Sequence, residues 1–132
     1  MAIDKVSLRI QSTALSASQL QALFERDGER LTERGSPVSS RQPDGPCHSV
    51  STLSFVSTAC GEEFGPHLKS LHWALATITE TRRSNLDLTA DLCVLVTSRP
   101  MGFAVFVDED VVNTLSAARC GIMVDTYSDT QG

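Results

Sequence analysis

Apolar and polar residues alternate in three stretches of the chain, and each stretch predicts a β-strand. Residues 5–10 (KVSLRI) and 48–57 (HSVSTLSFVS) alternate with a period of two, which is typical of a strand with one buried face. The stretch 120–127 (CGIMVDTY) shows the same alternation. Its two faces differ, with Ile122, Val124 and Thr126 on one and Met123, Asp125 and Tyr127 on the other.

Two further apolar runs, at 91–98 and 102–107, predict a β-hairpin because the turn residues Arg99 and Pro100 separate them. The segment 28–48 is rich in Gly, Pro, Ser and Arg. We expect it to form a long loop, with a short strand near Leu31 or Val38.

The spacing of apolar residues changes to that of a helix in three other segments. The first helix begins at Ser16, since Gln19 three residues later completes a capping box, and we expect it to end near residues 27–28. The second has Pro66 at its first position and an apolar stripe that extends to about Thr81.

The third predicted helix opens at Asp108, and Gly121 is expected to end it. The element order is then β-α-β-α-β-β-α-β within a single domain of residues 1–132. This order predicts an α+β fold, in which about three helices pack on a mixed or antiparallel sheet.

The composition is that of an ordinary globular domain. The chain has 132 residues, of which 41% are hydrophobic and 20% are charged, and this is enough for one core. No apolar run approaches the ~20 residues of a membrane span, so we expect no membrane contact. The first residues alternate like a strand and include Asp4, so we expect no signal peptide and a cytoplasmic location.

Four cysteines are expected to be free thiols, because disulfides are rare in the cytoplasm. They are Cys47, Cys60, Cys93 and Cys120.

The net charge of −5 comes entirely from the last third of the chain. Residues 85–132 contain seven acids and two bases, and seven minus two accounts for the whole excess. This asymmetry argues against nucleic-acid binding, which requires a basic surface, and permits a basic partner. A solvated acidic face without a partner is the simpler alternative.

Three consecutive acids, Asp108, Glu109 and Asp110, are candidates for a divalent metal site. However, consecutive side chains on a helix point in different directions. The N-cap and the first turn of a helix both favour carboxylates. We therefore predict that these acids cap the helix and bind no metal.

His67 and His72 are candidates for metal binding or catalysis. They are five residues apart, which places them about 140° apart around a helix, so they cannot share a metal. Cys60 and His67 could serve as nucleophile and base, but no nucleophile elbow or oxyanion loop accompanies them. We predict no catalytic residue, no metal and no cofactor, and a hydrolase using Cys60 or the carboxylates has little support.

Trp73 is the only tryptophan, and it points away from the apolar stripe of its helix. Two interpretations follow. Either Trp73 is exposed and anchors a partner, or a loop such as the 28–48 segment folds over it.

Four stretches of the chain resemble a bacterial family known only as domain of unknown function 4279. They are VSLRI followed by LSASQLQALF, the GSP turn, FGPHLKSLHWAL, and the closing VDEDVVNTLSAARCGIMVDTY. The similarity extends from about residue 5 to residue 127. One position differs, because the family usually has a tryptophan where this chain reads CHSVSTLSF.

The resemblance implies no established enzyme activity. Small acidic bacterial domains of this kind often serve as immunity proteins, so we expect this chain to bind and block a cognate toxin domain, such as a basic nuclease. The expected contact residues are Trp73, Asp108, Glu109, Asp110, Asp125 and Asp129. The alternative is a small-molecule-binding or regulatory domain, with its ligand held between the sheet and the 28–48 segment.

Overall fold

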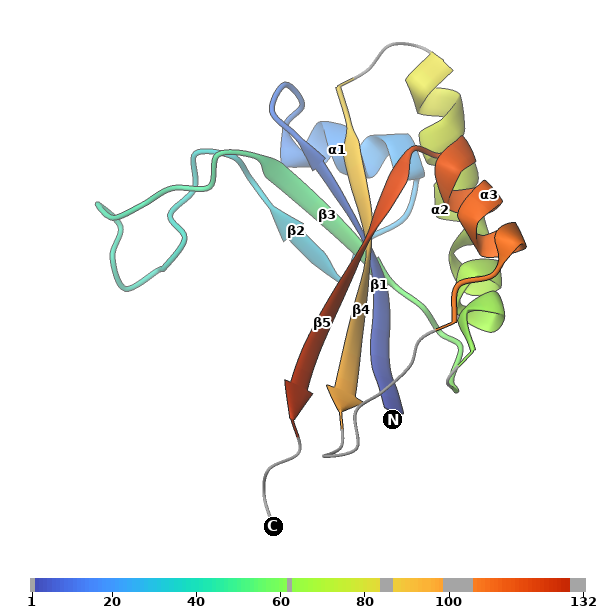
Figure 1. The fold of residues 1–132 in the computed structure, drawn as a ribbon. Helices are drawn as coiled ribbons and strands as arrows, with labels where there is room; N and C mark the ends of the chain where they lie inside the picture. Colours follow the sequence, from blue (N-terminus) through green and yellow to red (C-terminus); the bar gives the residue numbers. More distant parts are fainter. Residues whose placement is uncertain (1, 62, 84–86, 99–105, 129–132) are drawn as a thin grey trace.

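The computed structural model describes residues 2–61, 63–83, 87–98 and 106–128. Within these ranges the chain forms five strands and three helices (Figure 1). In chain order they are β1 (Ala2–Ser12), α1 (Ala17–Phe24), β2 (Arg30–Thr32), β3 (Ser51–Val56), α2 (Phe64–Arg83), β4 (Thr89–Ser98), α3 (Glu109–Ala117) and β5 (Cys120–Ser128).

The strands form one mixed sheet in the order β2-β3-β1-β4-β5. Neighbouring strands are antiparallel, except that β4 and β5 are parallel. The helices pack on one face of the sheet, as Figure 1 shows for α2 and α3 beside the strands. The predicted α+β class with a mixed sheet is confirmed.

The hydrophobic core lies between the sheet and the helices. Alternate residues of the central strands point into it, including Leu8 and Ile10 of β1 and Leu92 and Val94 of β4. The helices add the stripes that their spacing predicts, namely Leu20, Phe24, Leu68, Leu71, Leu75, Ile78, Val111 and Leu115. Across the described ranges, no helix covers the other face of the sheet.

The helix boundaries differ from the predicted ones. α2 begins at Phe64, two residues before Pro66, and proline is tolerated there because the N–H groups of a first turn have no partner within the helix. α2 is the longest helix, with 20 residues. Among the described residues, no helix is both long and apolar enough to cross a membrane.

Neither α1 nor α3 ends at a glycine, although the sequence predicts this for both helices. Glu25 and Arg119 take the left-handed conformation after these helices, with φ of 55° and 50°. The prediction that Gly121 ends α3 is therefore wrong, because Gly121 belongs to β5. The capping box of Ser16 and Gln19 at the start of α1 is confirmed.

The segment between α1 and β3 is more ordered than a plain loop. β2 confirms the short strand near Leu31. Residues 33–50, which we call the arm, project from the sheet away from α2 (Figure 1). Pro37 and Cys47 form an isolated antiparallel bridge within the arm, and the amide of His48 donates to the carbonyl of Ser36 at 2.8 Å.

The second strand of the predicted hairpin spans residues 102–107. Residues 102–105 of this strand lie outside the described residues. Phe106 and Val107 are described, and they precede α3 without belonging to a strand.

Candidate functional site

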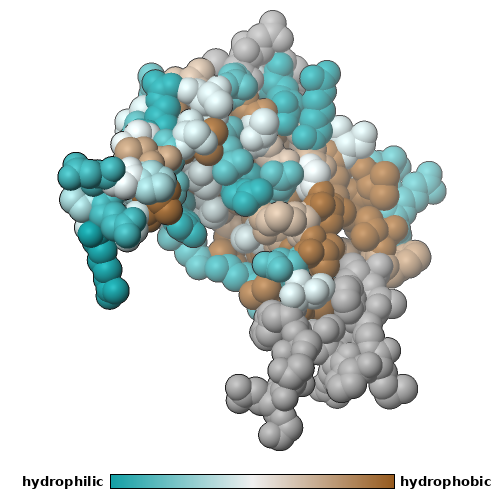
Figure 2. Space-filling model, turned by 60° about the vertical axis from the view of Figure 1, so that its left-hand side comes forward, coloured by the Kyte–Doolittle hydropathy of each residue, from teal (hydrophilic) through white to brown (hydrophobic). Residues whose placement is uncertain are grey.

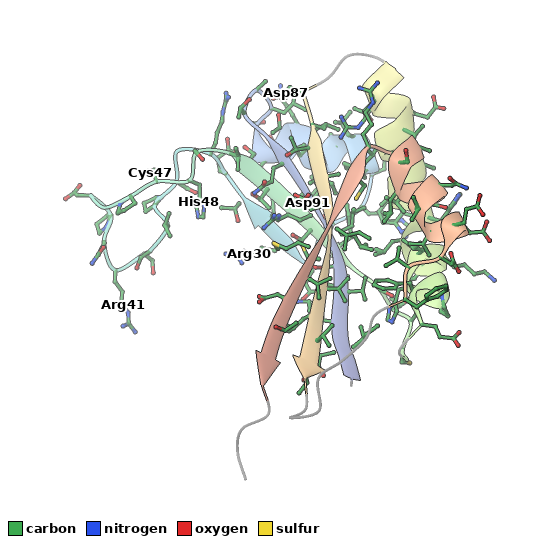
Figure 3. The ribbon with its side chains drawn as sticks, viewed as in Figure 1. Arg30, Arg41, Cys47, His48, Asp87 and Asp91 are labelled. Carbon is green, nitrogen blue, oxygen red and sulfur yellow. The ribbon has the colours of Figure 1, made fainter. Side chains whose placement is uncertain are left out.

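The sheet face opposite the helices carries mostly polar side chains. Directly paired residues of neighbouring strands point to the same face, so side chains form rows across the sheet. One row, which we call the central row, consists of Arg30, Ser54, Arg9, Asp91 and Gly121, from β2, β3, β1, β4 and β5 in that order. In Figure 3, Arg30 and Asp91 are labelled on the side of the sheet away from α2. Figure 2 brings this side forward and shows hydrophilic side chains on its left and centre, beside a hydrophobic patch toward the right.

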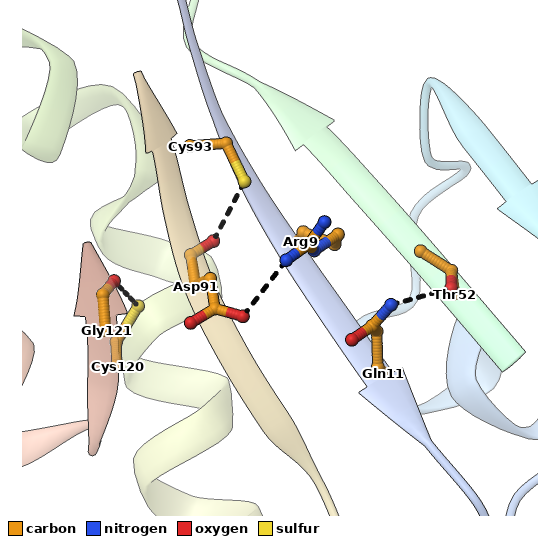
Figure 4. Close-up of polar contacts among 7 residues, drawn as sticks. All are labelled: Arg9, Gln11, Thr52, Asp91, Cys93, Cys120 and Gly121. Atoms are coloured by element: carbon orange, nitrogen blue, oxygen red, sulfur yellow. Dashed lines mark hydrogen bonds and ion pairs between the residues drawn. The ribbon is translucent and has the colours of Figure 1, made fainter. Parts of the chain in front are cut away.

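Arg9 lies at the centre of the central row. Its Nη2 atom pairs with Oδ2 of Asp91 at 3.3 Å (Figure 4), and both side chains are about one-third exposed. Its Nε atom is buried and has no hydrogen-bond acceptor among the described residues. The Arg9 guanidinium therefore has an unused donor on this face.

A shallow basin of about 390 Å³ lies along the central row. Its polar lining comes from Lys5, Arg9, Arg30, Ser7, Ser54 and Glu29. Lys5 pairs with Glu29 at 3.3 Å. The side chains of Arg30, Ser7 and Ser54 have no partner within the described part of the chain. The basin therefore combines several unused hydrogen-bond donors.

Gly121 allows the Asp91 carboxylate to occupy its position. A Cβ atom at Gly121 would lie 2.8 Å from Oδ1 of Asp91, which is closer than real Cβ contacts. The absence of a side chain on β5 at this point therefore leaves room for the carboxylate that holds Arg9.

The thiols of Cys93 and Cys120 lie close to Asp91. Burial, and to a lesser extent the Asp91 carboxylate, raise the pKa of the Cys120 thiol to about 11. Burial also raises the pKa of Cys93, while the positive charge of Arg9 opposes this rise. Cys47 and Cys60 are exposed. All four thiols are free, as predicted.

We expect iodoacetamide to alkylate Cys47 and Cys60 before Cys93 and Cys120 at about pH 8, because the thiolate is the reactive form. A raised pKa leaves less thiolate at a given pH. For Cys120, a pKa of about 11 instead of 9.0 leaves roughly 100-fold less thiolate. Peptide mass spectrometry over a time course measures the order, with protein in urea as the control. Equal rates for Cys60 and Cys120 in the folded protein would contradict the burial of Cys120.

A second surface lies on the helix side of the sheet, in a groove of about 320 Å³ between α2 and α3. Its polar lining comes from Asp108, Asp110, Lys69, His72 and Thr114, and its apolar lining from Leu68 and Val111. Two carboxylates and one ammonium leave the groove with a net negative charge.

Asp108 caps α3, as the sequence predicts. Its Oδ1 atom accepts a hydrogen bond from the amide of Val111 at 2.9 Å. Glu109 and Asp110 occupy the first turn, where carboxylates stabilise the positive end of the helix dipole. In the described ranges, no group of three or more His, Cys, Asp or Glu residues could hold a metal ion.

Trp73 is half-buried and packs in an aromatic cluster. Its ring centroid lies 4.8 Å from that of Phe55 and 6.4 Å from that of Phe24. The guanidinium of Arg26 lies 4.0 Å above the ring. The end of α1, the loop after it and Phe55 of β3 therefore cover part of Trp73. A loop lies over the ring, as the second interpretation requires, but Arg26 in this loop precedes the 28–48 segment.

His67 is buried, and both of its ring nitrogens have partners. Nε2 lies 3.0 Å from the carbonyl oxygen of Gly61, and Nδ1 lies 2.8 Å from the Ser57 hydroxyl. A carbonyl can only accept, so Nε2 carries a proton, and in the neutral imidazole Nδ1 then accepts from the Ser57 hydroxyl. His67 therefore ties α2 to the loop after β3.

The residues predicted to contact a partner do not form one surface. Asp108, Glu109 and Asp110 lie at the start of α3, Asp125 lies opposite Leu95 on the uncovered face, and Trp73 lies between α1 and α2. Asp129 lies outside the described residues. Among the members of this set that the structure describes, only Asp108 and Asp110 line the same groove.

Comparisons with known proteins do not identify the chain: no family model matches it, and neither does a curated protein or a solved structure. The resemblance to domain of unknown function 4279 therefore stays a prediction.

Proposed function

We propose that this protein binds a basic toxin domain and neutralises it by covering its active site. One observation carries the proposal: Asp108 and Asp110 lie in a groove that also has apolar walls. Lysine and arginine have an apolar stem and a charged head, so a basic side chain from a partner would match both features. The stem would contact Leu68 and Val111, and the head would pair with the carboxylates.

The distribution of charge supports a basic partner. The acid excess of the whole chain lies in residues 85–132, which include α3. Opposite charges on two proteins accelerate their encounter and fix their relative orientation. The resemblance described above supports the same class of partner.

Paired charge-neutral variants test the groove. Asn is as good an N-cap as Asp, so Asp108→Asn with Asp110→Asn removes two charges while the cap is retained. The matched control is Asp27→Asn with Asp44→Asn, which removes two charges outside the groove and outside the predicted contact residues. With a toxin partner, we expect association about 10-fold slower, and less dependent on salt, for the groove variant than for the control.

The partner is sought by co-expressing the protein with each product of the neighbouring genes, and scoring complex formation and suppression of toxicity. If no product is both bound and neutralised, the proposed function is wrong. If a toxin is neutralised equally by both double variants, the function stands but the groove is not the contact.

A further inference from the structure

The uncovered face of the sheet holds two arginines on either side of one serine. Arg9 pairs with Ser54 across β1 and β3, and Arg30 pairs with Ser54 across β2 and β3. Adjacent strands lie about 4.8 Å apart, so the two arginine backbones are roughly 10 Å from each other. Guanidinium groups on side chains of this length can reach the same point above Ser54.

We propose that this basin binds a small anionic molecule, whose carboxylate or phosphate oxygens lie between Arg9 and Arg30 above Ser54. The site belongs to neither the groove nor α3, since it lies on the opposite side of the sheet. The basin would be a ligand-binding site whether or not the protein binds a toxin.

Unused donors in the basin support an anion. The buried Nε–H of Arg9 has no acceptor in the described part of the chain. Burying a donor without a partner is unfavourable, so an oxygen atom placed there would relieve the cost. Arg30, Ser7 and Ser54 add further donors that no described residue uses.

The local charge also favours an anion, although the whole chain is acidic. The cations of the basin are Lys5, Arg9 and Arg30, and the acids beside it are Glu29 and Asp91. Three minus two leaves a net positive charge. Both acids already have a cationic partner, because Glu29 pairs with Lys5 and Asp91 pairs with Arg9.

The shape of the donors selects the class of ligand. Planar guanidinium groups present two parallel N–H bonds that match the oxygens of carboxylates and phosphates. A basin of about 390 Å³ is at the small end of the range for ligand sites. Val56 and Cys93 also line it and offer a small apolar contact to the rest of the molecule.

Amide chemical shifts measured by NMR test the proposal with two probes, inorganic phosphate and succinate, each compared with sodium chloride at equal ionic strength. We expect saturable shifts at the amides of Arg9, Arg30 and Ser54 with at least one probe. Arg30→Gln should weaken binding about 10- to 100-fold, because one charged hydrogen-bonding group is lost. Arg41→Gln on the arm removes the same charge and should leave binding unchanged.

Each outcome decides the proposal. Binding of phosphate alone, or of succinate alone, supports it and identifies the oxygen group that the site prefers, and binding of both supports the shared chemistry. No saturable shift with either probe overturns it, and so does an affinity that Arg30→Gln does not change. Arg9→Lys keeps the charge beside Asp91 but removes Nε, so it should also weaken binding.

Discussion

Leu92→Ala should lower the free energy of unfolding by about 2–5 kcal/mol, whereas Leu95→Ala in the same strand should lower it by about 1 kcal/mol or less. The two leucines are three residues apart in β4, so they point to opposite faces of the sheet. Leu92 is 0% exposed and lies beneath the helices. Leu95 is half-buried on the uncovered face, opposite Lys5 and Asp125.

The chemical change is identical at both positions, so the difference between them measures the burial of each face. Urea unfolding followed by Trp73 fluorescence gives both free energies, provided that the slope with denaturant is unchanged. A Leu95→Ala cost as large as that of Leu92→Ala would contradict an uncovered face. It would mean that another surface packs there in solution.

Alternation along residues 5–10 and 48–57 predicts strands with one buried face, and the structure confirms this for β1 and β3. In β3, Leu53 and Phe55 are buried and Thr52 and Ser54 are half-exposed, as the period of two requires. This prediction succeeds because a strand has only two faces, so one buried residue fixes the orientation of the others. In β5, residues 121–126 are exposed on both faces, although the alternation there is the same.

The glycines were misinterpreted because their role depends on residues that are distant in sequence. Gly28 and Gly121 both follow a helix, which is where a capping glycine is expected. In the structure, a Cβ atom at Gly28 would lie 2.3 Å from Leu53, and one at Gly121 would lie 2.8 Å from Asp91. Gly28 therefore permits a close approach of the loop after α1 to β3, and Gly121 a close approach of β5 to β4, and no local pattern reveals either contact.

The basin could not be predicted, because it depends on the order of the strands in the sheet. The pattern of residues along the chain does not reveal that order. Arg9, Arg30, Ser54 and Asp91 come from four strands, and each looks like an ordinary polar position when read along the chain. Only the order β2-β3-β1-β4 places them in one row. The same uncertainty affects the acids, because α3 and β5 place Asp110 and Asp125 on opposite sides of the sheet.

His67→Ala should lower the free energy of unfolding by about 2–4 kcal/mol, because it removes a buried ring and two hydrogen bonds. The Ser57 hydroxyl and the Gly61 carbonyl would both lose their imidazole partner. His72 lies five residues later on the same helix and is exposed, so His72→Ala is the matched control. Its effect should stay within about 0.5 kcal/mol.

His67→Phe separates packing from hydrogen bonding, because phenylalanine fills the space without a polar atom. If the hydrogen bonds matter, His67→Phe should remain destabilised by about 1–3 kcal/mol through the unpaired polar groups. A fully stable His67→Phe protein would show that His67 serves only to fill the core. We expect both variants to be destabilised while the NMR shifts of the groove residues stay unchanged. That result would show that His67 fixes the loop after β3 and has no part in the binding surfaces.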